Sequence, residues 1–473
     1  MSEQEIPVKI YGRLLHIPKS VGHLIEPHLC YEHVYVDYER GNYNTYAVTR
    51  KVYSSKGDDI VTFSGFEDRI CEVLKRYNYI PKVEHNYPLL APEIDRLAPT
   101  LTSKQLDILF SMALKPNGVY QAPTGYGKSF LIRQFCCMYP DSRIIIASKG
   151  RAVVHSLARE LSNGLEAHLN DVTSTGIDDP DKRIALVTSW SIVKLDTSKY
   201  DVLIFDEVHQ AAEPKNFNIL SQVHIPRFYG FSATPENRRD QADILIEALF
   251  GPIRVEVTFD EGIKDGRNVP MHVYLYPIAS GGALKKISKP SSYQRKSIGI
   301  WHNSYRNRVI AELTRYYVSK GNKILVLTEK IQHAKAIQEY LPEAEIASGK
   351  SKDLRDLLDR FVSGEVNPVI STFVWGAGIN VPDLDIIIRA DALSTEIPNI
   401  QASGRAARVS EGKEFGIIID FDDRFDFATR NSSARRIDVY RSRGWTIHSK
   451  TLPPSLSTSI TEQVDMSQQN IAD

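Results

Sequence analysis

The segment that most constrains the fold is the stretch GVYQAPTGYGKSFLIRQF, at residues 118–135. An apolar run, a glycine-rich turn and a helix-like stretch follow one another directly, which is the order strand, loop, helix. Within it, APTGYGKS matches the phosphate-loop pattern GxxxxGK followed by Ser or Thr, with Ala122 in place of the first glycine. A glycine loop that arose by chance is the competing interpretation, and the GKS ending between a strand and a helix argues against it. The segment therefore predicts a phosphate-binding site in an α/β fold.

The residue types of this loop indicate how a nucleotide would be held. Backbone N–H groups of a glycine-rich loop and the N-terminus of the next helix surround a phosphate. We expect Lys128 to contact the β- and γ-phosphates, and the Ser129 hydroxyl to bind Mg²⁺. The other loop residues predicted to bind the nucleotide are Pro123, Thr124, Gly125, Tyr126 and Gly127.

A second candidate element is LIFDEVHQ, at 203–210, where an apolar run ends in two adjacent carboxylates. Asp206 suits Mg²⁺, directly or through water, and Glu207 suits the positioning of an attacking water. A strand that ends in Asp-Glu is weak evidence alone, but it is strong evidence after a phosphate loop in the same α/β unit. The predicted chemistry is Mg²⁺-dependent phosphoryl transfer. We expect His209 to link this site to the next motif, and a histidine of the core is the alternative interpretation.

Short apolar runs alternate with helix-like stretches from about residue 100 onward. Runs that are apolar throughout are typical of parallel strands buried on both faces, and their alternation with helices indicates an α/β fold. These runs lie at 143–148, 183–189, 201–207, 228–234, 272–278, 323–329, 367–373, 384–390 and 415–421. We predict an α+β module at 1–95, two tandem α/β domains at 96–265 and 266–450, and a disordered polar tail at 451–473.

Composition excludes several classes of protein. Lys plus Arg and Asp plus Glu both number 58, so nucleic-acid binding cannot be inferred from net charge. The four cysteines show no metal-binding spacing and fit buried thiols of a reducing cytoplasm, and the histidines at 16–33 fit no standard zinc site. No apolar run approaches the roughly 18 residues of a membrane span, and the N-terminus does not resemble a signal peptide. We expect a cytoplasmic protein with no membrane partner.

Five motifs in the correct order give the chain a resemblance to the superfamily 2 helicases and translocases over about residues 100–445. APTGYGKS resembles motif I, DEVH (206–209) motif II, SAT (232–234) motif III, STFVWGAGINVP (371–382) motif V and QASGRAAR (401–408) motif VI. The resemblance implies two RecA-like domains that close on ATP and Mg²⁺. DEVH in place of DEAD moves the chain away from the DEAD-box RNA helicases, and Asn380 stands where many relatives have Asp.

The resemblance also implies roles for individual residues of the nucleotide site. Arg405 and Arg408 would act on the γ-phosphate as arginine fingers, which stabilise the charge of the transition state. Gln401 would lie near the attacking water or the γ-phosphate, and Gly378 of motif V would contact the nucleotide. Gln105 resembles the glutamine that pairs with adenine, although Lys104 replaces the usual flanking residue.

Family contacts with the nucleic-acid backbone fall on a further set of positions. These are Lys149, Arg151, Thr175, Gly176, Thr188, Thr328 and Thr372. Residues 281–310 are rich in Lys and Arg, contain no acidic residue and interleave aromatic rings, so Trp301 and Arg306 are also predicted to contact nucleic acid. A solvated basic loop is the alternative interpretation of this stretch.

Within the superfamily, the compact size and HNSYRNRVIAEL (302–313) resemble the phage UvsW-like branch-migration enzymes. This resemblance implies a monomeric, phage-encoded motor in a bacterial cytoplasm that acts on single-stranded, forked or four-way-junction DNA in replication, recombination or repair. The module at 1–95 would recognise the DNA substrate. Two alternatives remain open: an RNA helicase, and a nucleotide-gated DNA-binding or translocating subunit of a larger complex.

Overall fold

A computed structural model describes most of the chain, which forms two compact units. The first unit holds the residues up to Ala122 together with Gly127–Val257, and the second holds Pro123–Tyr126 together with the residues from Thr258 onward. The described residues are 4–39, 42–88, 90–233, 242–278, 280–349, 351, 353–372, 374–375, 381, 383–394, 404 and 406–451. Apart from Thr451, the tail predicted to be disordered lies outside these residues.

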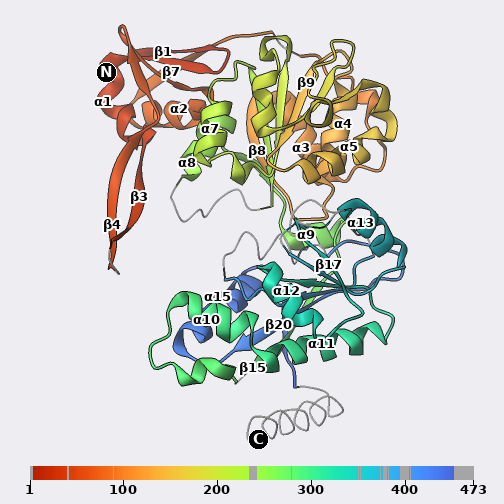
Figure 1. Cartoon of the computed structure of the whole chain (residues 1–473). Helices are drawn as coiled ribbons and strands as arrows, with labels where there is room; N and C mark the ends of the chain where they lie inside the picture. The colour runs from red at the N-terminus through yellow and green to blue at the C-terminus, as the bar shows by residue number, and fades with distance from the viewer. Residues whose placement is uncertain are drawn as a thin grey trace, which may run out of the picture. The chain divides into compact units, whose positions relative to one another are not determined.

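The larger part of the first unit is a seven-stranded, all-parallel sheet (Figure 1). In sheet order its strands are β10 (Leu169–Asp171), β11 (Ile184–Thr188), β9 (Ile144–Ser148), β12 (Val202–Asp206), β13 (Arg227–Ser232), β8 (Asn117–Gln121) and β14 (Ile253–Glu256). Its helices are α3 (Ser103–Leu114), α4 (Lys128–Met138), α5 (Arg151–Leu165), α6 (Val172–Thr175), α7 (Pro214–Leu220) and α8 (Asp243–Phe250). Strands β9, β11, β12 and β13 are buried along their whole length, as the apolar runs predict.

The second unit repeats the same architecture. Its seven parallel strands are, in sheet order, β17 (Glu345–Ala347), β18 (Val369–Ser371), β16 (Ile324–Leu327), β19 (Ile386–Arg389), β20 (Gly416–Asp423), β15 (Met271–Ile278) and β21 (Thr446–Ser449). Its helices are α9 (Phe259–Lys264), α10 (Ser292–Lys296), α11 (Ser304–Val318), α12 (Ile331–Gln338), α13 (Leu354–Ser363) and α15 (Phe427–Ser442). The prediction of two tandem α/β sheets is confirmed.

The N-terminal part of the first unit is a small α+β module. Its mixed sheet runs, in order, β5 (Ser54–Lys56), β6 (Asp59–Phe63), β2 (Leu14–Pro18), β1 (Gln4–Tyr11) and β7 (Tyr79–Asn86), and the helices α1 (Gly22–Ile25) and α2 (Glu67–Arg76) accompany it. Strands β3 (Cys30–Glu39) and β4 (Asn42–Lys51) form a separate antiparallel ribbon that projects from the module (Figure 1).

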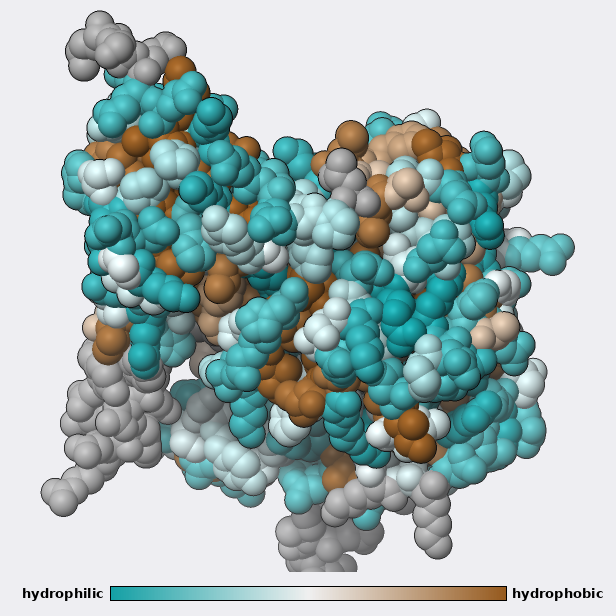
Figure 2. Space-filling model, turned by 90° about the horizontal axis from the view of Figure 1, so that it is seen from above, coloured by the Kyte–Doolittle hydropathy of each residue, from teal (hydrophilic) through white to brown (hydrophobic). Residues whose placement is uncertain are grey.

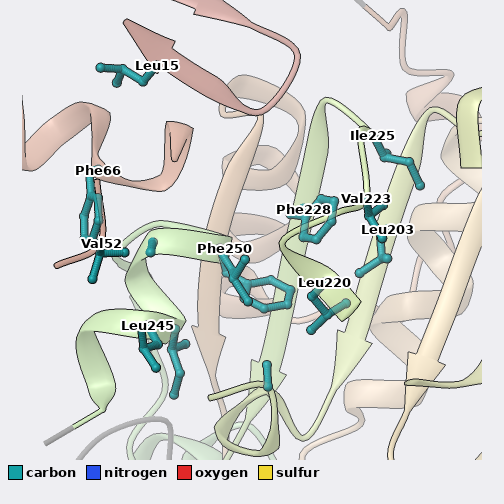
Figure 3. Close-up of a cluster of buried hydrophobic side chains, with 14 of the residues drawn as sticks. Leu15, Val52, Phe66, Leu203, Leu220, Val223, Ile225, Phe228, Leu245 and Phe250 are labelled. Atoms are coloured by element: carbon teal, nitrogen blue, oxygen red, sulfur yellow. The ribbon is translucent and has the colours of Figure 1, made fainter. Parts of the chain in front are cut away.

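This module and the parallel sheet share one hydrophobic core. Leu15 and Phe66 from the module belong to the same buried cluster as Leu203, Phe228 and Phe250 from the sheet and α8 (Figure 3). At Gly65 the backbone approaches α8 so closely that a Cβ atom would lie 2.0 Å from the Glu247 carbonyl oxygen. Only glycine therefore fits at this contact.

Arg13 is buried at the same boundary. Its guanidinium group lies 3.3 Å from the centre of the Phe228 ring and donates hydrogen bonds to the carbonyl oxygens of Leu220 and Leu249. Burial lowers the pKa of Arg13 to about 9. Ion pairs from Arg69 to Glu247 and from Arg254 to Asp68 lie around this core. The module is thus joined to the sheet by apolar packing, by hydrogen bonds and by ion pairs.

The visible surface is mainly hydrophilic, with apolar side chains in small groups between polar ones (Figure 2). Within the described part of the chain, no helix combines the length and the hydropathy that crossing a bilayer requires.

Replacing Arg13 tests whether the shared core stabilises both parts of the unit. Arg13→Ala removes one hydrogen-bond donor from each of two carbonyl oxygens and opens a cavity, so we expect the free energy of unfolding to fall by about 3 kcal/mol. Urea denaturation followed by circular dichroism measures the change. Arg76→Ala, which removes an exposed ion pair with Glu72, is the control and should change stability by less than about 1 kcal/mol. Equal effects of the two substitutions would contradict a stabilising role for Arg13.

Candidate nucleotide-binding site

The candidate site lies where three neighbouring parallel strands end. Strands β12, β13 and β8 are adjacent in the sheet and point the same way, so the loops that follow them meet at one edge. Asp206 ends β12, and its backbone is in register with Phe231 of β13. The N–H group of Ala122, which begins the phosphate loop, donates to the Ser232 carbonyl oxygen of motif III at 3.0 Å. Pairing of the strands thus brings motifs I, II and III together.

The phosphate loop leads directly into α4. Gly127 caps this helix with φ +98°, a left-handed conformation that favours glycine, and Lys128 and Ser129 form the first turn. The Lys128 ammonium donates to the Ala122 carbonyl oxygen at 3.3 Å, across the base of the loop. The free N–H groups of the first turn of α4 are the groups that bind anions at helix N-termini.

The motif II carboxylates differ in environment. Asp206 is only 8% exposed, and one of its carboxylate oxygens, Oδ1, is buried without a hydrogen-bond partner in the described structure. Burial and the neighbouring Glu207 raise the pKa of Asp206 to about 7, while Lys128 acts in the opposite direction. A buried oxygen ligand with an unused acceptor, near a phosphate loop, fits the needs of a Mg²⁺ ion. Glu207 takes the left-handed conformation (φ +59°), which is uncommon outside glycine.

His209 connects motif II to motif III. Its Nδ1 atom lies 3.1 Å from the Ser232 hydroxyl and 3.5 Å from Glu207 Oε2, and the ring is buried. His209 of motif II therefore contacts Ser232 of motif III directly, as a linking role requires.

Gln105 has a structural partner as well as its predicted role. Its side-chain oxygen accepts from the Thr102 N–H group, while the Thr102 hydroxyl caps the N-terminus of α3. Its amide nitrogen lies beside the phosphate loop, 3.4 Å from where a Cβ atom of Gly127 would be. Pairing of Gln105 with adenine stays a prediction.

Two residues that the sequence did not single out contact the phosphate loop. Pro123–Tyr126 belong to the second compact unit, in which the Tyr126 hydroxyl donates to Asp265 at 2.7 Å. The Asn268 amide donates to the Thr124 carbonyl oxygen at 2.9 Å. Neither residue lies in a recognisable motif, so no pattern in the sequence could have identified them.

Only some of the residues predicted for motifs V and VI are among the described residues. Gly378, Gln401 and Arg405 lie outside the described residues. Arg408 is described, and its backbone forms an antiparallel bridge with Asn268. The roles assigned to these residues stay predictions.

Several predicted nucleic-acid contacts lie on the surface of the first unit. Arg151, Thr175 and Gly176 are exposed, as is Lys149, although its ammonium group bonds Glu213 at 2.6 Å. Thr188 is largely buried, and its hydroxyl lies 2.9 Å from that of Ser191. In the second unit, Thr372 is half-buried.

Three predicted contacts in the second unit are corrected by their burial. Arg306 has no exposed surface: it pairs with Asp423 at 2.9 Å and donates to the Ala390 carbonyl oxygen at 2.8 Å. Trp301 is 4% exposed and packs edge-on against Tyr293, and Thr328 is 1% exposed. These side chains stabilise the fold and cannot reach a nucleic acid.

Geometry and sequence together define a class: a protein with two RecA-like sheets and a phosphate-loop nucleotide site. Two family models match the chain, "Type III restriction enzyme, res subunit" over residues 94–237 and "Helicase conserved C-terminal domain" over residues 306–410. The chain belongs to the superfamily 2 helicases, whose members are ATP-driven helicases and translocases.

Individual relatives are distant. The chain is similar to the probable helicase D10 of Escherichia phage T5, with 23% identity over 52% of this chain and 54% of that protein. It is 22% identical to the DNA 3'-5' translocase XPB2 of Sulfurisphaera tokodaii, over 68% of this chain and 80% of that protein. The match thus spans about half of the phage relative. The structure of S. cerevisiae Dbp5 bound to RNA and ADP BeF3 shares the fold, with a TM-score of 0.56 and 14% identity over 77% of this chain and 97% of that one.

Removal of the loop lysine tests the nucleotide site. Lys128→Ala takes away the cation expected on the phosphates, and we expect steady-state ATP hydrolysis to fall about 100-fold or more. Arg133→Ala, at a half-buried position further along α4, is a matched loss of one cation and should leave the rate within about twofold. A normal rate in Lys128→Ala would show that the motif I assignment is wrong.

The raised pKa of Asp206 predicts a pH-dependent stability. In the protein without nucleotide and Mg²⁺, this group binds its proton more tightly when folded than when unfolded, so its contribution to stability is lost progressively as the pH rises from about 4, the pKa of an unperturbed Asp, through about 7. Asp206→Asn, which cannot ionise, should therefore raise the urea midpoint relative to the wild type, and by more at pH 8 than at pH 5. Asp107→Asn, on the exposed face of α3, is the control. The same increase at both pH values would contradict the burial of an ionisable Asp206.

Proposed function

We propose that this protein is an ATP-dependent DNA translocase or helicase that remodels forked and four-way-junction DNA. The observation that carries the proposal is the shared core of the first unit, which fixes the N-terminal module rigidly to the domain that holds the phosphate loop and motif II. A module fixed in this way would carry its bound substrate along with the motor domain. The relative named as a DNA translocase supports a DNA substrate.

The chain's own residues divide the work of hydrolysis. Lys128 binds the β- and γ-phosphates, and Ser129 with Asp206 would hold a Mg²⁺ ion, which neutralises phosphate charge when bound. Glu207 and Gln401 orient the attacking water. Arg405 and Arg408 stabilise the negative charge that develops on the transferred phosphoryl group. His209 passes the state of motif II to Ser232 of motif III through their contact.

Contacts to DNA would be mainly with its backbone, so sequence specificity should be low. Lys149, Arg151, Thr175 and Gly176 are the exposed candidates in the first unit. The protein would act as a monomer in the cytoplasm of a bacterium that carries the phage encoding it. Participation in replication, recombination or repair would follow from the substrates that it remodels.

Two other functions make different predictions. The fold alone does not choose between DNA and RNA, because it is shared with S. cerevisiae Dbp5, whose structure contains RNA. An RNA helicase would depend on contacts with the 2′-hydroxyl group. A nucleotide-gated subunit of a larger complex would need a partner before it hydrolyses ATP.

ATP hydrolysis in the presence of different nucleic acids separates these functions. We expect forked DNA and four-way junctions to raise the steady-state rate about tenfold or more, and single-stranded DNA to raise it less. RNA of matched sequence should have little effect, and Lys128→Ala is the background control. Stimulation by RNA alone would replace the proposal with an RNA helicase. A rate that no nucleic acid changes would favour the partner-dependent subunit.

A further inference from the structure

A cavity of about 760 Å³ opens in the first unit, between the base of the β3–β4 ribbon and helix α7. Tyr31 and Arg50, paired across the ribbon, line one side, and Phe217 of α7 lines the opposite side. The Phe63 ring, which also lines the cavity, meets the Phe217 ring edge-on, with 5.8 Å between the ring centroids. Because the module and the sheet share one core, the walls of this cavity are held in place.

The chemistry of the lining is basic and aromatic. Arg50, Lys51 and Lys56 are exposed at the rim, and no Asp or Glu is among the described residues that line the cavity. Half-buried aromatic rings lie below them, from Tyr31, Tyr53, Phe63 and Phe217. Lys51 lies 5.3 Å above the Tyr53 ring. Cations that meet phosphates and rings that stack on bases are the combination found where single-stranded nucleic acids bind.

The far wall of the cavity is tied to the nucleotide site. Helix α7 follows motif II in the chain, and the buried Asn216 on this helix donates to the Gln210 carbonyl oxygen at 2.8 Å. The Ser189 hydroxyl donates to the Asn216 side-chain oxygen, also at 2.8 Å. An occupant of the cavity would therefore contact a helix that is anchored one residue beyond His209.

We propose that this cavity binds one unpaired nucleotide of a branched DNA, with its base against the tyrosine rings and its phosphates on Arg50, Lys51 and Lys56. The inference rests on the proposed function and names the part of the substrate that the N-terminal module recognises. A volume of this size is in the range of small-ligand sites, about 300–1,000 Å³, and matches a nucleotide rather than a duplex.

The cost of unpairing explains why such a site would select branched DNA. Extruding a base from a duplex costs the free energy of its pairing and stacking, whereas a base at a branch point is already unpaired. Stacking on an aromatic side chain stabilises an unpaired base. The balance favours binding at a branch and disfavours binding along an intact duplex.

Anisotropy titrations of a labelled DNA fork test the phosphate contacts. Lys51→Ala combined with Lys56→Ala should weaken fork binding about tenfold and reduce the slope of log K against log salt by about 1.4, which is two phosphate contacts at 0.7 each. Lys9→Ala combined with Lys75→Ala removes the same charge from exposed positions of the module away from the cavity. This control should keep the wild-type slope. Equal effects in the two double variants would overturn the proposal.

A fork with an abasic residue at the branch tests the base contact. Wild-type protein and Tyr31→Phe should bind the intact fork about fivefold or more tightly than the abasic fork, and Tyr31→Ala should bind both equally. A preference that persists in Tyr31→Ala would overturn the base-binding role. Binding of the wild-type protein to a labelled polyglutamate peptide that excess fork DNA does not displace would overturn this role in favour of an acidic protein partner.

The ATPase rate keeps this inference separate from the proposed function. If the wild-type rate rises with DNA while the cavity variants match their controls in fork binding, the cavity inference alone fails. If no DNA changes the wild-type rate, the proposed function fails as well. Lys51→Ala with Lys56→Ala should keep the rate without DNA, because neither residue belongs to the nucleotide site.

Discussion

The parallel pairing of β12, β13 and β8 is the constraint on which the candidate site depends. Hydrogen bonds between these strands place the end of motif II, the start of the phosphate loop and motif III at one sheet edge. Lys128, Asp206 and Ser232 come from segments up to about a hundred residues apart, and only the common strand direction brings them together. The chemistry of this edge is thus a consequence of backbone pairing before any side chain is considered.

Much of the fold could be predicted because its central strands are chemically uniform. Val202–Asp206 is apolar up to the residue where it ends, and the structure buries every residue of it. Short edge strands such as β10 and β17 have no such run, so periodicity could not place them. The phosphate loop could be located because glycine and lysine at fixed spacing follow from the needs of phosphate binding.

The basic stretch at 281–310 shows where local sequence misleads. It contains no acidic residue, yet Arg306, Arg295 and Lys296 bond to Asp423, Asp426 and Glu329, which lie 33 to 131 positions away in the chain. The charge of a segment counts only residues that are close in sequence. Whether its cations are available to a ligand depends on the residues that are close in space. For the same reason Asp265 and Asn268, beside the phosphate loop, carried no signal in the sequence.

The burial of Arg13 in the shared core also constrains how the N-terminal module can evolve. A domain joined by a linker can be lost, duplicated or exchanged as a cassette, because neither partner depends on the other for its interior. The N-terminal module supplies a cation and apolar side chains to the interior of the motor domain, and Gly65 fits against α8 with no space to spare. Exchange of this module would require simultaneous changes in α8 and β13. Its sequence is therefore expected to diverge together with that of the motor domain, rather than independently of it.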